Sequence, residues 1–282
     1  MIPIDFQYVA AQSVAEAIRQ YHQFSTSDMS TRYYSGGTEI ITLARLHQLT
    51  MDAVIDIKPI PAAQVCSIVE EKLFLGAALT LSQITSHPMM SRAFPLLQVA
   101  VNEIADRTAR NKITLGGNLC GDIIYREAVL PLLVCDSMVR IAGPNGAKEE
   151  SIHRIFRRTM QLKPGEFIVQ IATDKIYRCA PFFHVKRRKM GKVGYPIVSA
   201  AAIRLQDNIH IALSGVCSFP FRSRTMEDWL NQKHLPVHQR IEEAIQIIPP
   251  ELILNDYEAS REYRRFVLRT VLEETLHQLG SA

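Results

Sequence analysis

Two diglycine turns are the residues of this sequence best suited to bind a ligand. Gly36-Gly37 follows a predicted strand and precedes a predicted helix, and Gly116-Gly117 lies in the string from residue 110 to 118. Glycine adopts positive φ angles and lets bare backbone approach a phosphate, and a helix that follows adds a positive dipole end. Neither turn has the spacing of a Rossmann or a Walker motif. Together they predict a pair of loops that clamps one dinucleotide pyrophosphate, whereas either turn alone is also compatible with a plain tight turn.

The five cysteines do not indicate a metal site. They are odd in number, lie far apart and form no CxxC pair, and they are Cys66, Cys120, Cys135, Cys179 and Cys217. This spacing favours reduced thiols over a disulfide framework, a zinc site or an iron–sulfur cluster. Any metal chemistry is therefore expected on another chain, and no catalytic acid, base or nucleophile is indicated by spacing.

Composition predicts a globular protein that binds no nucleic acid and has no membrane span. The 282 residues are 47% hydrophobic, and 32 basic against 28 acidic residues give a formal net charge of +4. That balance lacks the concentrated basic surface of a nucleic-acid binder. The N-terminus has no basic and apolar leader pattern, and no apolar stretch approaches the roughly 18 residues of a membrane span. We expect a cytoplasmic protein.

Two small α/β units must position the diglycine turns. In the first, Ser13 and Glu16 have capping-box spacing for a helix over 13–23, and strands are predicted at 32–34 and 53–57 around a helix at 39–46. In the second, Thr80 and Gln83 have the same capping spacing. Its further predicted elements are strands 67–69, 73–75 and 138–141 and helices 95–104 and 128–135.

A third region changes from strands to helices, which predicts an α+β domain. The predicted elements are strands 167–172, 182–185, 197–205 and 209–213 and helices 240–248 and 260–279. The last helix is expected to turn an apolar face toward the core, formed by Tyr263, Phe266, Val267, Thr270 and Leu272.

Five motifs in order resemble those of the FAD subunits of the molybdenum hydroxylase family, which includes xanthine dehydrogenase and carbon monoxide dehydrogenase. The similar stretches, from about Phe6 to Phe221, are Tyr34-Ser35-Gly36-Gly37-Thr38-Glu39, Leu75-Gly76-Ala77-Ala78-Leu79-Thr80, Arg110-Asn111-Lys112-Ile113-Thr114-Leu115-Gly116-Gly117-Asn118, Leu162-Lys163-Pro164-Gly165-Glu166 and Phe182-Phe183-His184-Val185-Lys186-Arg187-Arg188. The resemblance implies an α+β fold with a two-subdomain FAD-binding domain, of the type related to vanillyl-alcohol oxidase-like flavoproteins. Expected boundaries are 1–165 for that domain, with subdomains of about 1–58 and 59–165. A smaller C-terminal domain over 166–282, with an antiparallel sheet and helices, would cover the flavin.

The resemblance also implies which residues contact FAD. From the two loops these are Tyr34, Ser35, Gly36, Gly37, Thr38, Glu39, Thr114, Gly116, Gly117 and Asn118. They would hold the pyrophosphate and neighbouring groups through backbone N–H groups and short polar side chains.

Three further cofactor candidates lie outside the loops, and each has a second interpretation. Glu127 stands where the family has Asp, in an altered stretch over 123–127, and either accepts hydrogen bonds from FAD or is a solvated carboxylate at a helix start. His184 replaces a family lysine, so its charge would change near neutral pH unless it is an unpaired core or surface histidine. Tyr195 either stacks on the isoalloxazine or packs into the core from a strand.

The basic run Lys186-Arg187-Arg188-Lys189 is the one charge cluster that invites a partner. Its length and the balanced composition disfavour nucleic acid. A solvated face, or docking to an acidic partner or a phosphate, is the expectation.

The implied function is an electron relay. The FAD would take electrons from a [2Fe–2S] small subunit, which receives them from a molybdopterin-binding large subunit that oxidises a purine or another heterocycle, and deliver them to NAD or another acceptor. Two alternatives stay open: a stand-alone FAD-dependent oxidoreductase, and a cofactor-free assembly subunit of the same fold.

Overall fold

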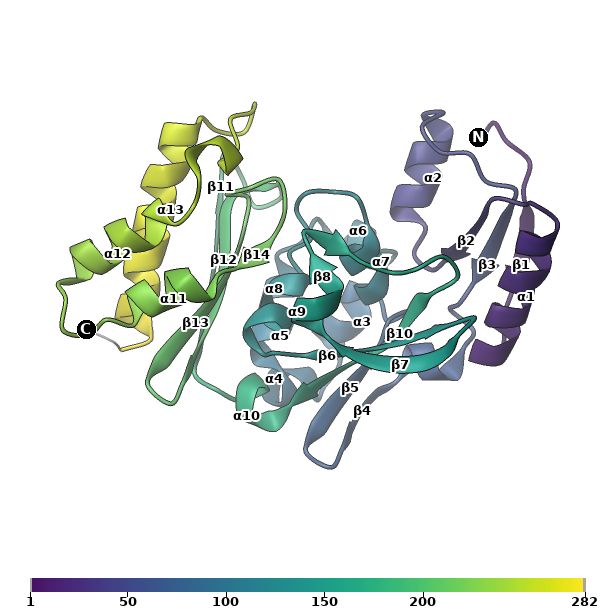
Figure 1. Ribbon diagram of the computed structural model, residues 1–282, viewed down its shortest axis with the longest axis horizontal. Coiled ribbons are helices and arrows are strands. Elements are labelled where there is room, and N and C mark those ends of the chain that lie inside the picture. The colour runs from purple at the N-terminus through teal and green to yellow at the C-terminus, as the bar shows by residue number, and fades with distance from the viewer. Residues whose placement is uncertain (1, 281–282) are drawn as a thin grey trace. The chain divides into compact units, whose positions relative to one another are not determined.

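The computed structural model describes residues 2–280 and divides them into two compact units that alternate along the chain (Figure 1). The first unit contains residues up to 86 together with 107–121 and 137–173. The second contains 87–106, 122–136 and the chain from 174 onward. The domain boundaries at residues 58 and 165 stay predictions. The division into compact units follows other limits, because it places the internal segments 87–106 and 122–136 with the C-terminal part. Within the described residues, no helix is long and apolar enough to cross a membrane, and no cluster of three or more His, Cys, Asp or Glu could hold a metal ion.

The first unit begins with a three-stranded parallel sheet in the order β1-β3-β2. Its strands and helices are β1 (Gln7–Ala10), α1 (Val14–Thr26), β2 (Thr31–Tyr34), α2 (Thr38–Arg45) and β3 (Ala53–Asp56). The Ser13 hydroxyl accepts from the Glu16 N–H at 3.1 Å, so the predicted cap and helix are confirmed. Because parallel strands end at one edge, the chain after Tyr34 and the chain after Asp56 leave the sheet side by side.

A five-stranded sheet in the order β4-β5-β10-β6-β7 completes the first unit. Its strands are β4 (Cys66–Val69), β5 (Lys72–Gly76), β6 (Met138–Gly143), β7 (Gly146–Ser151) and β10 (Phe167–Asp174). The short elements around it are η1 (Pro61–Gln64), α3 (Leu81–Ser86), α6 (Arg107–Arg110), α7 (Leu115–Cys120), α9 (Ile152–Ile155), β8 (Phe156–Arg157) and β9 (Thr159–Met160). Thr80 and Gln83 cap one another as predicted, through bonds of 2.7 and 3.1 Å.

The second unit is built on a four-stranded antiparallel sheet in the order β11-β12-β13-β14. The strands are β11 (Phe182–Arg188), β12 (Pro196–Leu205), β13 (Asn208–Ser214) and β14 (Phe221–Arg222). In Figure 1, α11 (Arg224–Leu230), α12 (Val237–Gln246) and α13 (Arg261–Gln278) lie on one side of this sheet, and α5 (Pro95–Asn102) and α8 (Val129–Val134) on the other. The unit's remaining elements are α4 (Met90–Ala93), α10 (Lys175–Arg178) and η2 (Pro250–Leu252). The predicted α+β class is confirmed.

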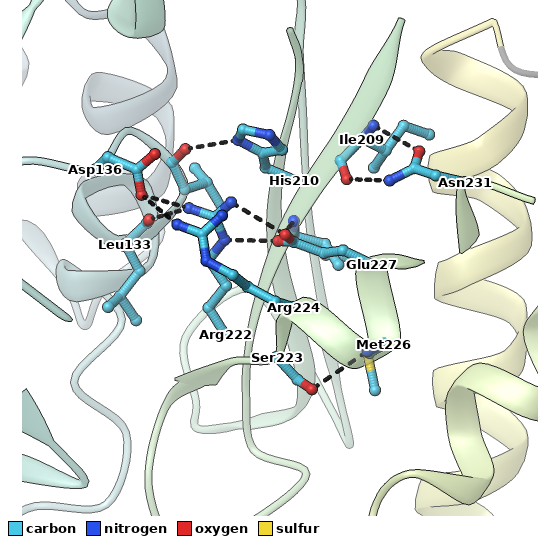
Figure 2. A network of polar contacts seen from close by, with 12 residues as sticks. Leu133, Asp136, Ile209, His210, Arg222, Ser223, Arg224, Met226, Glu227 and Asn231 are labelled. Carbon is cyan, nitrogen blue, oxygen red and sulfur yellow. Dashed lines mark hydrogen bonds and ion pairs between the residues drawn. The ribbon is translucent and has the colours of Figure 1, made fainter. Parts of the chain in front are cut away.

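A buried arginine joins the end of α8 to this sheet (Figure 2). Arg222 donates from Nε and Nη2 to the Glu227 carboxylate at 2.6 and 3.0 Å, and from Nη1 to Asp136 Oδ1 and to the Leu133 carbonyl, both at 2.8 Å. Glu227 also accepts the Ile211 N–H at 2.8 Å. An arginine fork suits this task because its fixed donors can serve several acceptors at once. The network explains why residues 122–136 group with the C-terminal part of the chain.

The predicted apolar face of the last helix is correct at Val267 and Leu272 and wrong at Tyr263 and Phe266. The buried residues of α13 are Arg264, Val267, Leu268, Val271, Leu272, Thr275 and Leu276. Arg264 lies on this face because it donates to the carbonyls of Ile197 and Gly215 at 2.8 and 2.6 Å. Tyr263 and Phe266, which were expected in the core, are exposed.

Candidate functional site

The first diglycine loop connects β2 to α2 in the first unit. Gly37 has φ +73° and is the N-cap of α2, which has no side-chain cap. A Cβ added at Gly37 would lie 2.4 Å from the Tyr34 hydroxyl oxygen. Glycine is therefore required here for two reasons, its left-handed backbone and its closeness to the tyrosine ring.

Lys58 anchors this loop from the end of the neighbouring strand. Its Nζ donates to the Ser35 carbonyl at 3.1 Å and to Asp56 Oδ2 at 2.6 Å, and lies 4.5 Å from the centre of the Tyr34 ring. The Tyr8 hydroxyl also donates to Asp56, and this hydrogen bond, with burial, raises the pKa of Tyr8 to about 12. Lys58 was missed in the sequence, although the shared edge of two parallel strands could have indicated it.

The second diglycine loop is held by the segment after β5. The Gly116 N–H donates to the Ala77 carbonyl at 2.8 Å, and the Gly117 N–H to Thr114 Oγ1 at 3.2 Å. The Asn118 N–H bonds the Thr114 carbonyl at 2.8 Å. These N–H groups therefore stabilise the loop itself, and an added Cβ at Gly116 would meet the Ala77 Cβ at 2.8 Å. The motif at residues 75–80 and the second loop form one structural element.

The two loops meet within the first unit. A Cβ added at Gly36 would lie 2.1 Å from the carbonyl oxygen of Lys112, and one added at Gly121 would lie 2.8 Å from Glu39 Oε2. The structure thus brings together all ten candidate residues of the two loops, which lie far apart in the sequence.

The meeting point of the loops fits a phosphate-bearing cofactor. The N-terminus of α2 carries a positive partial charge and no side-chain cap. The Ser35 hydroxyl is buried and has no hydrogen-bond partner among residues 2–280. A buried hydroxyl without a partner costs free energy, which a bound oxygen-rich group would recover. The chain's own groups are therefore compatible with FAD.

Glu127 lies in the second unit and is not the solvated carboxylate of the alternative interpretation. It is 2% exposed, and its Oε2 lies 2.5 Å from Lys186 Nζ. Burial raises the pKa of Glu127 and lowers the pKa of Lys186, while each partner's charge opposes the shift of the other. Its second oxygen, Oε1, is buried without a partner in the part of the chain described.

His184 lies on β11, two residues from Lys186, and the expectation that its charge changes near neutral pH is wrong. Burial lowers the pKa of His184 to about 4, helped by the charges of Lys186 and Arg188 and opposed by that of Glu103. The imidazole is therefore neutral at pH 7.

Tyr195 lies just before β12 and does not pack into the core as a strand residue. It is half exposed, and its ring stacks on that of Tyr125 with centroids 4.6 Å apart and planes 19° apart. Tyr125, in the altered stretch over 123–127, was missed by sequence reasoning because no local pattern pairs it with residue 195.

The basic run over 186–189 is solvated in part: the side chains of Lys186 and Arg188 are largely buried, whereas those of Arg187 and Lys189 are exposed. Lys186 pairs with Glu127, Arg187 with Glu274 and Arg188 with Glu103. Lys189 Nζ donates to the Tyr257 carbonyl at 2.7 Å.

Comparisons with known proteins agree with these features. Residues 4–173 match the model of a family described as the FAD binding domain in molybdopterin dehydrogenase. The chain is 25% identical to the glyceraldehyde dehydrogenase medium chain of Sulfolobus acidocaldarius, over 99% of this chain and all of the relative. It is also 25% identical to the carbon monoxide dehydrogenase medium chain of Hydrogenophaga pseudoflava, over 79% and 78% of the two chains.

Solved structures show the same fold. A chain of the carbon monoxide dehydrogenase from Hydrogenophaga pseudoflava, 23% identical, superposes with a TM-score of 0.86 over 99% of this chain and 98% of its own. A chain of quinoline 2-oxidoreductase from Pseudomonas putida gives 0.85 at 20% identity, over 98% and 97%. The resemblance drawn from the motifs is confirmed: the chain belongs to the FAD-binding domain family of the molybdopterin dehydrogenases, and its cofactor is FAD.

Proposed function

We propose that this chain is the electron-transfer subunit of a multi-subunit molybdenum hydroxylase. A molybdopterin-binding large subunit and a [2Fe–2S] small subunit are its proposed partners, and NAD or another small molecule is the final acceptor. The observation that carries the proposal is the meeting of two diglycine loops, held by Lys58 on one side and residues 77–79 on the other. We place the complex in the cytoplasm, which suits five free cysteines.

Each candidate residue has a proposed part in holding FAD. Ser35 and the N-terminus of α2 receive phosphate oxygens, Gly36 lets the first loop approach the second, and Gly116 lets the second loop lie against Ala77. Thr114 and Asn118 shape the second loop. In the second unit, Tyr195 lies against the isoalloxazine, and Glu127 and His184 line the surroundings of the cofactor.

FAD supplies the redox chemistry when bound, because a flavin accepts electrons singly and releases them in pairs. The chain's residues bind it, orient it and exclude water. No side chain of the chain is proposed as an acid, base or nucleophile toward an organic substrate.

We propose a purine or another N-heterocycle as the substrate of the whole complex. In support, the relatives include the nicotinate dehydrogenase FAD-subunit of Eubacterium barkeri and the xanthine dehydrogenase FAD-binding subunit of Escherichia coli O157:H7, at 23% and 22% identity. The substrate pocket would belong to the large subunit. The support for this substrate class therefore comes from the relatives and not from residues of this chain.

Purification of the chain from its native host tests the proposal. The expected result is a complex that contains molybdopterin, [2Fe–2S] centres and FAD, in which a purine reduces the flavin. Partners that lack molybdopterin or iron–sulfur centres would overturn the relay. Reduction of the flavin by substrate in the isolated chain would favour a stand-alone oxidoreductase instead.

A further inference from the structure

The two diglycine loops differ in how their backbone N–H groups are used. In the second loop, the N–H groups of residues 115–118 all donate to acceptors within the chain. In the first loop, the N–H groups of residues 36–38 have no acceptor among residues 2–280. The first loop therefore keeps these donors for a ligand, whereas the second loop uses its own to hold its shape.

The conformation of the first loop makes its donors converge. Gly37 is left-handed, with φ +73° and ψ −2°, and Thr38 begins the right-handed helix α2. Such a change of hand turns successive N–H groups toward one point, which is the arrangement of an anion-binding nest. The Ser35 hydroxyl, buried without a partner in the described part of the chain, belongs to the same loop. The shape of the loop suits an oxyanion such as a phosphate group.

Two adjacent glycines do not fix this shape by themselves. Glycine adopts left-handed and right-handed conformations about equally readily, so the peptide units on either side of Gly36 are free to rotate. In a trans peptide unit the C=O and the N–H point in opposite directions. A group that holds the Ser35 carbonyl therefore also decides where the Gly36 N–H points.

Lys58 is the group that holds this carbonyl. It lies just after β3, and its Nζ donates to the Ser35 carbonyl at 3.1 Å. Asp56, which is 2% exposed, fixes Lys58 in turn: Oδ2 accepts from Nζ at 2.6 Å, and Oδ1 accepts from the Lys58 N–H at 2.9 Å. Nζ also lies 4.5 Å from the centre of the Tyr34 ring. An ammonium group has three donors, and these three partners use them, so Lys58 acts on a phosphate through the loop.

We propose that Lys58 is a positioning residue for the pyrophosphate of FAD. It orients the Ser35–Gly36 peptide unit so that the N–H groups of residues 36–38 face the phosphate oxygens. Its positive charge also polarises the peptide unit whose carbonyl it binds, which strengthens the Gly36 N–H as a donor. The inference rests on the proposed role of the first loop in holding FAD.

The test compares Lys58→Met with Lys148→Met in the full chain. Lys148 is a matched control on β7, because its Nζ pairs with Glu166 at 2.6 Å, as that of Lys58 does with Asp56, and its side chain is 35% exposed against 41%. Lys58→Met is expected to raise the dissociation constant of FAD about tenfold, as for the loss of a charge-assisted hydrogen bond. Lys148→Met is expected to raise it less than about twofold.

Inorganic pyrophosphate and an arginine variant separate positioning from general destabilisation. Pyrophosphate is expected to compete with FAD for the wild-type chain, and Lys58→Met is expected to weaken this competition by about the same factor as it weakens FAD binding. Lys58→Arg is expected to restore most of the FAD affinity, because arginine also carries a positive charge and N–H donors. Without FAD, the free energy of unfolding is expected to fall by similar amounts in the two Met variants, since each loses one ion pair.

The outcomes separate this inference from the proposed function. If the wild type holds FAD and Lys58→Met weakens FAD binding no more than Lys148→Met does, Lys58 does not position the loop and the relay stands. Pyrophosphate that fails to compete with FAD, or competes equally well in the wild type and in Lys58→Met, would also overturn the inference. So would a Lys58→Arg variant that binds FAD as weakly as Lys58→Met. A wild-type chain that holds no FAD would overturn both proposals.

Discussion

At the scale of single residues, the two loops differ in what they demand of glycine. The Cβ of any residue at position 36 would collide with the backbone of Lys112, which cannot rotate away. At Gly117 the nearest atom is the Thr114 hydroxyl, at 2.7 Å from an added Cβ, and a side chain can give way. The close approach of the two loops therefore requires glycine at position 36, whereas the contact at Gly117 lies within the second loop.

Gly36→Ala is accordingly expected to lower FAD affinity at least about tenfold, equivalent to about 1.4 kcal/mol, because the loops must separate. Gly194→Ala is the control, since nothing lies closer than 3.8 Å to its added Cβ. Flavin content after gel filtration and the dissociation constant measure the effect. Equal FAD retention by the two variants would refute the assignment of the loops.

Burial of His184 is expected to make the free energy of unfolding depend on pH. Its folded pKa of about 4 lies below the ordinary value of 6.5, so the native state binds fewer protons than the unfolded chain between these values. The contribution of His184 to the free energy of unfolding is fully present above pH 6.5. It is lost as pH falls toward 4, and the loss is at most about 3 kcal/mol.

His184→Gln is expected to flatten the stability profile between pH 6.5 and 4, measured by urea unfolding with FAD present in excess throughout. The groups that face His184, namely Glu103, Lys186 and Arg188, stay in place in this variant. An unchanged slope in that window would show that His184 is accessible to protons in the native state.

At the scale of elements, Arg222 is the residue that fixes α8 to the C-terminal sheet. Arg222→Met leaves the carboxylate of Glu227 buried without its partner, and breaking such a pair costs about 3–5 kcal/mol. Arg224→Met is the matched control, because that side chain is 69% exposed and lies 3.6 Å from Asp136 (Figure 2). The free energy of unfolding of the control is expected to fall by at most about 1 kcal/mol. Urea unfolding that shows equal losses for the two variants would contradict this role of Arg222.

Local patterns predicted most elements, and long-range contacts account for what they did not predict. The helix caps at Ser13 and at Thr80 depend on residues only three positions apart, and their prediction was correct. The buried face of α13 was partly predicted incorrectly because it includes a charged residue, Arg264. The Arg264 side chain is buried where it donates to carbonyls in β12 and just after β13.

The candidate site was predictable to a similar degree. The loops were found from glycine spacing, whereas their anchor Lys58 depends on the pairing of β2 with β3. The burial of Glu127 by Lys186 joins residues 59 positions apart, and no local signal reports such a pair.

At the scale of the whole molecule, the chain alternates between two units, and the proposed roles divide between them. The first unit holds both diglycine loops, and the second holds Glu127, His184 and Tyr195. The similarity to the glyceraldehyde dehydrogenase medium chain covers 99% of this chain and therefore includes residues of both units.

In the proposed function this chain carries FAD as a relay between a metal-containing partner and an acceptor. Anaerobic addition of a purine to the isolated chain, and then to the chain reconstituted with its two partner subunits, tests it by flavin absorbance. The account predicts that the isolated chain retains FAD and is not reduced, and that the flavin bleaches once both partners are present. A chain without flavin, or one that the substrate reduces on its own, would contradict it.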